Sequence, residues 1–331
     1  MKKQSTTIGR KKDKQKMTRL VTSLSILAVS CLFTIILSKS NEQLQPYKLD
    51  VSRINTKEGD TLKPLLVPRP PGSPAHAKVQ EQLRAWYREI GWQEEIYRFT
   101  AQTPKGPIEM ANLVFTEPHG VNVTERVILS AHYESKLKAL DSKQEGIFVG
   151  ATDSAVPCAM IVELSRALTG TSERSFAFQA VFFDGEEAFE NWTNTDSLYG
   201  SRHLADVWEK ENKLKNIRLF ILFDLLGAAR PRIPNYAQST DRYFKQLVEI
   251  EAKHRAKGFS FFHYIDRVGD NVFIADDHLP FHQRGLRNIL HIIPSPFPTV
   301  WHRLADNGDA IDPQTVTDLT EIFYEFLKNL K

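Results

Sequence analysis

The chain has 331 residues, enough to bury one large hydrophobic core or two ordinary ones. Its 41% hydrophobic and 25% charged residues are typical of a folded globular protein and exclude a disordered or fibrous chain. The net charge of +3 is unevenly placed, because residues 1–20 hold eight basic residues and only one acid, Asp13. The remainder is slightly acidic, which argues against a nucleic-acid-binding surface.

Residues 20–37 form an apolar run of eighteen residues without a charge, just long enough to cross a bilayer as a helix. We expect a transmembrane signal anchor that is not cleaved, because residues 38–41 offer no small-x-small cleavage site. The basic residues 1–19 then predict a cytoplasmic tail and a lumenal body. A cleaved signal peptide and a mitochondrial presequence are the alternatives.

The cysteines and the glycosylation sequons also bear on whether the body of the chain is lumenal. Cys31 lies in the apolar run and Cys158 is alone in the body, so we expect no intrachain disulfide in the folded domain. Sequons at Asn122 and Asn191 fit a lumenal address, although such triplets also arise by chance.

Residues 38–75 are predicted to be a stem or linker, since 64–74 holds too many prolines for a helix or a central strand. The body, 76–331, alternates two kinds of segment. Apolar, β-rich runs predict strands at 112–116, 126–131, 176–183, 217–223 and 288–293. Helices are predicted at 79–90, 155–168, 198–210, 240–257 and 312–330.

This alternation predicts a single α/β domain with a mixed, mainly parallel central sheet flanked by helices. Ligands in such folds bind beyond the carboxyl ends of the strands. Acids or histidines follow four of the predicted strands there, and one acid precedes a helix. These residues are His132, Asp184, Glu186, Glu187, Asp224, His302 and, before the helix, Asp153.

Each of these residues also has an ordinary structural explanation. Asp153 could cap the helix that follows it, Asp184 could open a turn, and the two adjacent glutamates could be solvated. Carboxylates gathered at one sheet edge, however, resist burial unless a cation compensates them. Histidine and carboxylates without paired cysteines favour zinc with an open coordination position. One glutamate of the Glu186–Glu187 pair can then bind metal while the other acts as general acid/base.

Five blocks of this sequence closely resemble the glutaminyl cyclases, relatives of the zinc aminopeptidases. The blocks are GATDSAVPCAMI (150–161), FFDGEEAFE (182–190), DSLYGSRHLAD (196–206), DDHLPFH (276–282) and IPSPFPTVWHR (293–303). They occur in order and at matching spacing, and the resemblance runs from about residue 76 to the C-terminus. It implies a zinc-aminopeptidase-like fold.

The resemblance also assigns roles to ten residues. The implied ligands of one Zn²⁺ per chain are Asp153, Glu187 and His302. The implied catalytic residues are Glu186, as acid/base, with Asp224 and Asp276 as hydrogen-bonded carboxylates beside it. The implied walls of the substrate pocket are Trp192, Ile274, Phe297 and Trp301.

The implied reaction converts N-terminal glutamine of peptides and proteins, and slowly glutamate, to pyroglutamate with release of ammonia. Anchored forms of the family reside in the Golgi, which predicts a type II Golgi membrane protein with a lumenal catalytic domain. A secreted or mitochondrial protein is the alternative. The oligomeric state is not predicted.

This chain departs from the family pattern at three positions. Ala131 replaces a cysteine that pairs in some members, Ala275 replaces a frequent glutamine, and Glu134 replaces the usual aspartate after His-Tyr. A zinc aminopeptidase is the main alternative, with His132, Asp153 and Asp224 as ligands of a second metal. A catalytically inactive, receptor-like ectodomain is the lesser alternative, although no ligand is lost.

Overall fold

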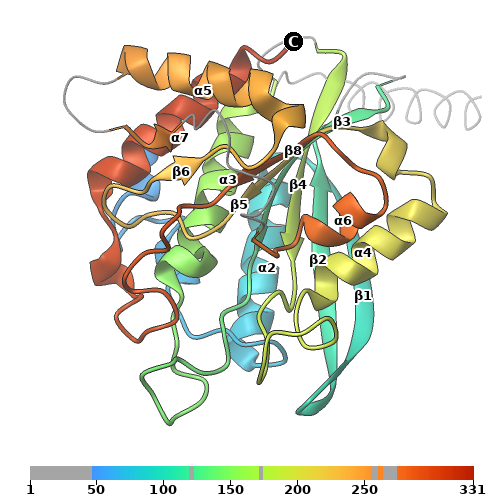
Figure 1. The fold of residues 1–331 in the computed structure, drawn as a ribbon, viewed down its shortest axis with the longest axis vertical. Helices are drawn as coiled ribbons and strands as arrows, with labels where there is room; N and C mark the ends of the chain where they lie inside the picture. Colours follow the sequence, from blue (N-terminus) through green and yellow to red (C-terminus); the bar gives the residue numbers. More distant parts are fainter. Residues whose placement is uncertain (1–46, 119–122, 171–173, 255–259, 264–273) are drawn as a thin grey trace, which may run out of the picture. The chain divides into compact units, whose positions relative to one another are not determined.

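The computed structural model describes residues 47–118, 123–170, 174–254, 260–263 and 274–331 (Figure 1). The chain divides into two units, Met1–Gln45 and Pro46–Lys331, and every element below belongs to the second. The predicted cytoplasmic tail and membrane anchor, 1–37, lie outside the described residues. Among the helices that the structure does describe, none has the length and apolar character needed to span a membrane.

A six-stranded sheet forms the centre of this unit, with the strand order β1-β2-β4-β3-β5-β8. The strands are β1 (Gln93–Thr103), β2 (Gly106–Thr116), β3 (Glu125–His132), β4 (Phe176–Phe183), β5 (Ile217–Phe223) and β8 (Ile289–Ile292). The strands β4, β3, β5 and β8 are parallel, whereas β1 and β2 are antiparallel to their neighbours. The predicted α/β fold with a mixed, mainly parallel sheet is confirmed.

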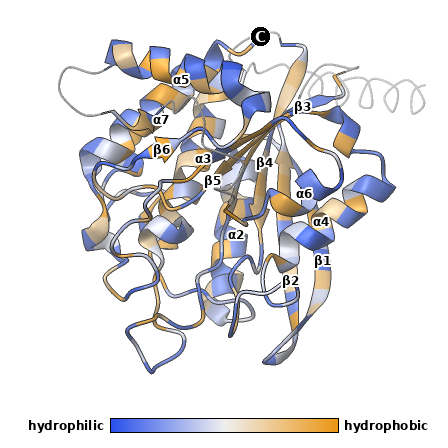
Figure 2. Cartoon of the chain, viewed as in Figure 1, coloured by the Kyte–Doolittle hydropathy of each residue, from blue (hydrophilic) through white to orange (hydrophobic). Residues whose placement is uncertain are grey.

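The four parallel strands carry nearly continuous apolar runs and are buried on both faces of the sheet. Figure 2 shows these strands as the apolar centre of the unit, and every residue of β4 is buried. Successive residues of β3 point to opposite faces. Leu129 lies in the larger hydrophobic cluster and Ile128 in the smaller one.

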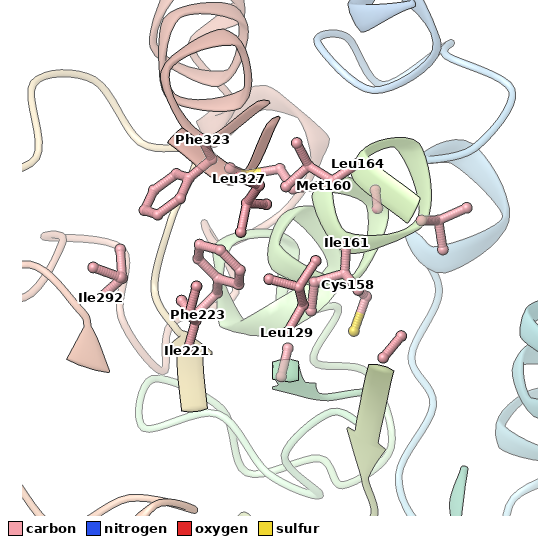
Figure 3. Close-up of a cluster of buried hydrophobic side chains, with 14 of the residues drawn as sticks. Leu129, Cys158, Met160, Ile161, Leu164, Ile221, Phe223, Ile292, Phe323 and Leu327 are labelled. Carbon is pink, nitrogen blue, oxygen red and sulfur yellow. The ribbon is translucent and has the colours of Figure 1, made fainter. Parts of the chain in front are cut away.

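Four helices cover the face with the larger cluster. They are α2 (Pro74–Glu89), α3 (Val156–Leu168), α5 (Asp241–His254) and α7 (Pro313–Lys328). In Figure 3, Ile161 of α3 and Phe323 of α7 lie close to Leu129 and Phe223 of the sheet. The opposite face is covered by α4 (Tyr199–Lys210) and the short α6 (Leu279–Gln283), through Trp208 and Phe281.

The helix boundaries follow from capping residues. Ser73 accepts a hydrogen bond from the His76 amide at the start of α2, and Asp312 accepts one from the Thr315 amide at the start of α7. Proline follows both caps, where its missing N–H costs nothing.

Three strands were not predicted. The strand β1, which forms a hairpin with β2, is mostly polar and has Ala101 as its one buried residue, so it lacks an apolar run. A second, two-stranded sheet joins β6 (Ile233–Pro234) to β7 (Phe262–His263), and both strands are too short to show a period.

The predicted linker is wrong for residues 47–75, because this segment packs on the domain. Ile54, Leu62 and Leu65 are buried in the larger cluster. The Thr61 hydroxyl donates to Glu163 of α3 at 2.5 Å, and Arg69 is fully buried. Before α2, the regular structure of this segment is limited to two short 3-10 helices, Val51–Arg53 and Lys63–Leu65. The compact unit nevertheless begins at Pro46 rather than at the predicted residue 76.

We predict that a chain beginning at His76 is much less stable than one beginning at Pro46. Each lost apolar side chain contributes about 1.5–3 kcal/mol through burial. Domains have only about 5–15 kcal/mol of stability in total. Thermal unfolding should show a cooperative transition for residues 46–331 and none for 76–331. Equal midpoints would show that the segment is a linker after all.

Candidate active site

The site lies where the parallel strands end. His132 is the last residue of β3, Asp184 follows β4, and Asp224 follows β5. Parallel strands bring these ends to one edge of the sheet. The turn before α3 adds Asp153, and the segment after β8 adds His302. Side chains far apart in the sequence therefore meet here.

Three of these side chains converge on one point. The Nε2 atom of His302 lies 2.8 Å from Glu187 Oε1 and 3.3 Å from Asp153 Oδ2. All three residues are buried, and neither of these carboxylate oxygens accepts a hydrogen bond. Buried oxygens without donors are costly unless a cation compensates them. The residues thus fit a metal ion, as the geometry of their ligand atoms also allows.

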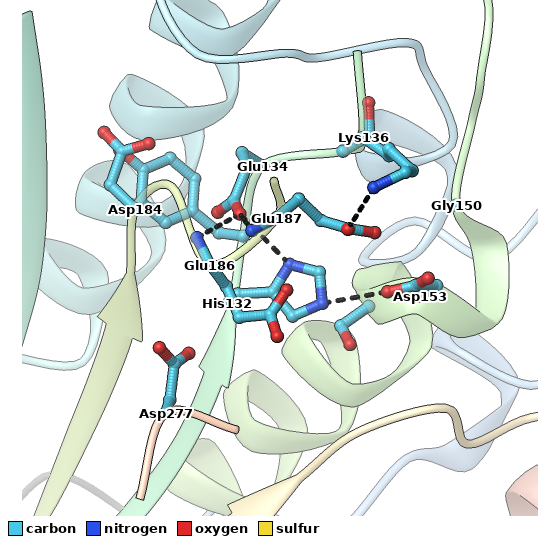
Figure 4. A network of polar contacts seen from close by, with 12 residues as sticks. His132, Glu134, Lys136, Gly150, Asp153, Asp184, Glu186, Glu187 and Asp277 are labelled. Atoms are coloured by element: carbon cyan, nitrogen blue, oxygen red, sulfur yellow. Dashed lines mark hydrogen bonds and ion pairs between the residues drawn. The ribbon is translucent and has the colours of Figure 1, made fainter. Parts of the chain in front are cut away.

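The other oxygen of each carboxylate is held by a donor (Figure 4). His132 Nε2 lies 3.0 Å from Asp153 Oδ1, and Lys136 Nζ donates to Glu187 Oε2 at 2.8 Å. In each carboxylate the contact with His132 or Lys136 thus fixes one oxygen, and the other oxygen faces His302.

The turn that carries Asp153 is fixed from two sides. Asp306 accepts from the Thr152 amide at 2.8 Å through its side chain, and from the Ala151 amide at 3.1 Å through its carbonyl oxygen. Gly150 has a φ of 63°, and a Cβ there would overlap the Asp153 carbonyl. The capping explanation for Asp153 is wrong, because Ala155 precedes α3 without a side-chain cap.

The turn after β4 separates the two adjacent glutamates. Glu134 Oε1 accepts from the amides of Glu186 at 2.6 Å and Glu187 at 3.2 Å. Asp184 opens this turn and does not line the pocket, because its carboxylate accepts from the Ala111 amide of β2 and contacts His76 Nε2 of α2 at 2.9 Å. Its ordinary structural explanation therefore holds.

Glu186 is buried among other acids. Burial raises the pKa of its carboxyl well above the usual range. His132 opposes this shift in pKa, while Glu187, Asp276 and Asp277 add to it. A carboxyl group with a raised pKa can hold and release a proton near neutral pH.

Two further carboxylates lie in the pocket and differ in their environments. Burial raises the pKa of Asp224 to about 6, although the hydrogen bond from His132 opposes the shift. Burial would also raise the pKa of Asp276, but the net shift is downward because His291 Nε2 lies 2.7 Å from its Oδ2.

Aromatic side chains wall a pocket of about 190 Å³ above these acids. The ring centroids of Phe297 and Trp301 are 5.1 Å apart in an edge-to-face contact, and those of Trp301 and His302 are 4.0 Å apart in a stacked contact. Trp192 is 44% exposed and stands at the rim. All ten residues singled out by the resemblance line this one pocket: Asp153, Glu186, Glu187, Trp192, Asp224, Ile274, Asp276, Phe297, Trp301 and His302.

The sequence did not reveal several supporting residues. Lys136 and Arg69 stand in no recognisable pattern. Asp196 heads one of the five blocks, and its carboxylate accepts from the amides of Phe189, Glu190 and Asn191. It thereby shapes the loop that carries Trp192.

Comparison with known proteins gives a consistent result. The model of peptidase family M28 matches residues 112–327. A glutaminyl-peptide cyclotransferase-like protein from Bos taurus is 40% identical over 285 residues, which cover 80% of this chain and 73% of that protein. The Bos taurus glutaminyl-peptide cyclotransferase is 37% identical over 319 residues, 86% of each chain. The crystal structure of Macrostomum lignano glutaminyl cyclase superposes with a TM-score of 0.72 at 34% identity, covering 86% of this chain and 93% of that one.

We predict that Asp196→Ala loosens the loop of Trp192. Three amides and the Tyr199 hydroxyl lose a charged acceptor. A hydrogen bond to a charged group contributes about 1.5–3 kcal/mol to the stability of the fold. Thermal unfolding should shift down, and limited proteolysis should cut within 189–196. Tyr199→Phe removes one of these bonds and is the matched control. Unchanged proteolysis of Asp196→Ala would mean that the loop is held by other contacts.

Proposed function

The chain belongs to the glutaminyl-peptide cyclotransferases of peptidase family M28, and we propose from this premise how its pocket performs the reaction. The enzyme closes the N-terminal glutamine of a peptide or protein into pyroglutamate. The free α-amine attacks the γ-amide carbon, a five-membered lactam forms, and ammonia leaves. The observation that carries the assignment to this pocket is the gathering of all ten implied residues around it.

Glu186 is the proposed proton carrier. It takes a proton from the attacking amine and gives it to the departing nitrogen, a role that suits a buried carboxyl with a raised pKa. The nearby acids Asp224 and Asp276 hold fixed positions through Ser154 and His291. They orient the proton carrier and the amine.

The aromatic walls hold the glutamine side chain folded against its own amine. Bringing the two reacting groups together removes much of the entropic cost of ring closure. Trp192, Phe297 and Trp301 also exclude water, which disfavours hydrolysis of the amide to glutamate. The second residue of the substrate lies toward the open mouth, so many second residues should be accepted.

We further propose that Asp153, Glu187 and His302 hold one zinc ion per chain. Two buried carboxylate oxygens that accept no hydrogen bond and both face His302 Nε2 support this choice, and oxygen and imidazole ligands suit zinc. When bound, zinc polarises the γ-carbonyl and stabilises the negative charge that develops on its oxygen.

A zinc aminopeptidase is the second candidate, because His132, Asp153 and Asp224 could also hold an ion. In this structure, however, His132 Nε2 is directed at Asp153 Oδ1. Asp224 Oδ1 accepts from the Ser154 hydroxyl and the Leu225 amide. Asp153 Oδ1 and Asp224 Oδ1 thus already have hydrogen-bond partners, unlike Asp153 Oδ2 and Glu187 Oε1, and this supports a single metal ion.

We predict one zinc ion per chain in dialysed protein. Chelation should abolish turnover, and added zinc should restore it. His302→Ala should lose most of the bound zinc, because one of three ligands is gone. The control is His254→Ala, which removes a half-exposed ion pair with Glu325. Two tightly held ions per chain would support the aminopeptidase instead.

We predict that Glu186→Gln lowers kcat by roughly 10²–10⁴-fold while zinc stays bound, because an amide cannot carry the proton. Glu190→Gln, an exposed neighbour in the same loop, is the matched control. Mass spectrometry of a Gln-Ala peptide reports loss of ammonia. Removal of the first residue instead, or reaction of an acetylated glutamine peptide, would rule out the cyclisation mechanism.

We propose that the mature chain is a type II Golgi membrane protein with a lumenal catalytic domain. Residues 20–37 and the basic residues before them support this location. Asn191 is exposed, so its sequon is open to glycosylation, while Asn122 lies outside the described residues.

We predict that full-length protein from animal cells resists alkaline extraction and shifts in mass after glycosidase treatment. Asn191→Gln should remove the part of the shift due to that site. Recovery of a soluble chain beginning near residue 40 would instead indicate cleavage and secretion.

A further inference from the structure

Lys136 is a partly buried cation that the reaction described above does not use. It follows β3, and its Nζ donates to Glu187 Oε2 at 2.8 Å and to the Ala188 carbonyl oxygen at 3.3 Å. Its side chain is 14% exposed, whereas the other paired lysines of the described residues are at least 38% exposed. Burying a lysine is costly unless its charge is paired. This ion pair therefore differs from the surface ones.

The contact with Lys136 places the two carboxylate oxygens of Glu187 in different environments. The Oε1 atom faces His302 Nε2 and accepts no hydrogen bond, while Oε2 is taken by the ammonium group. A carboxylate with both oxygens free can bind a cation through one oxygen or through both. With Oε2 held by Lys136, binding through both would break a buried ion pair.

Asp153 is limited in the same way from the other side. Its Oδ1 faces His132 Nε2 at 3.0 Å, and its Oδ2 faces His302. The protein therefore presents three ligand atoms, one from each residue. Catalytic zinc sites with three protein ligands keep a fourth position for water or substrate.

We propose that Lys136 is a positioning residue that restricts Glu187 to one-oxygen coordination and so keeps the fourth metal position open. That the substrate γ-amide occupies this position rests on the proposed function. That Glu187 coordinates through one oxygen rests on the contacts of Glu187 alone. Without Lys136, Oε2 turns toward the metal and competes with the substrate.

Cobalt substitution of the full-length chain tests the coordination directly. Four-coordinate Co²⁺ absorbs visible light much more strongly than five-coordinate Co²⁺. Lys136→Met keeps the length of the side chain but removes the donor. Its cobalt spectrum should weaken to the five-coordinate form, while Lys136→Arg, which keeps a charged donor, should retain the strong spectrum of the parent protein.

Turnover supplies a second readout. For the zinc enzyme, Lys136→Met should lower kcat/KM for a glutamine peptide by about 10–100-fold, the usual effect of losing a partner of a metal ligand. The loss should fall mainly on KM, because the carboxylate competes with substrate. Lys210→Met removes an exposed ion pair with Asp206 and should change neither readout.

A cobalt spectrum of Lys136→Met identical to that of the parent would overturn the proposal, whatever the activity. If this variant does not fold, Lys136→Gln replaces it, since a shorter neutral amide holds the carboxylate less firmly. If the parent protein does not cyclise glutamine but the spectrum changes as expected, the proposed function fails and the coordination role of Lys136 stands.

Discussion

The structure of this site depends on the compensation of negative charge that is buried at one edge of the sheet. Acids buried there in the described part of the chain include Glu134, Asp153, Glu186, Glu187, Asp224, Asp276 and Asp277. Such a group cannot be buried ionised without donors or cations. Backbone amides, Lys136 and histidines supply part of this compensation, and burial raises the pKa of Glu186 and of Asp277. Two carboxylate oxygens that accept no hydrogen bond, Asp153 Oδ2 and Glu187 Oε1, face His302 at one point, where a metal ion fits.

This requirement explains why the segment before α2 belongs to the catalytic domain. Arg69 is fully buried and donates to the carbonyl oxygens of Tyr133, Val149 and Gly150. It thereby ties the end of β3 to the turn that carries Asp153. Its fixed charge also lies near the acids Glu134, Asp153 and Asp306. The N-terminal segment thus contributes a cation to the base of the site as well as apolar side chains to the core.

The sequence predicts the parts of this protein that follow from local patterns. Buried parallel strands such as β4 carry continuous apolar runs, so their positions and the acids at their ends could be found. The segment 46–75 could not, because its packing depends on tertiary contacts such as Thr61 with Glu163. Lys136 could not be found either, since a single lysine has no period or motif. The ten pocket residues came from a family resemblance, and spacing alone left Asp153 open to a capping role.

Glu134 shows how one substitution relative to the family pattern fits the same constraint. Its Oε1 accepts from the amides of both Glu186 and Glu187 and lies 3.5 Å from His132 Nδ1. One buried carboxylate therefore fixes the backbone of the proposed proton carrier and of the proposed metal ligand together. From this turn Glu187 reaches His302, while Glu186 lies near the acids Asp276 and Asp277. An aspartate is one methylene shorter, so it could hold both amides only if the turn after β4 moved closer to β3.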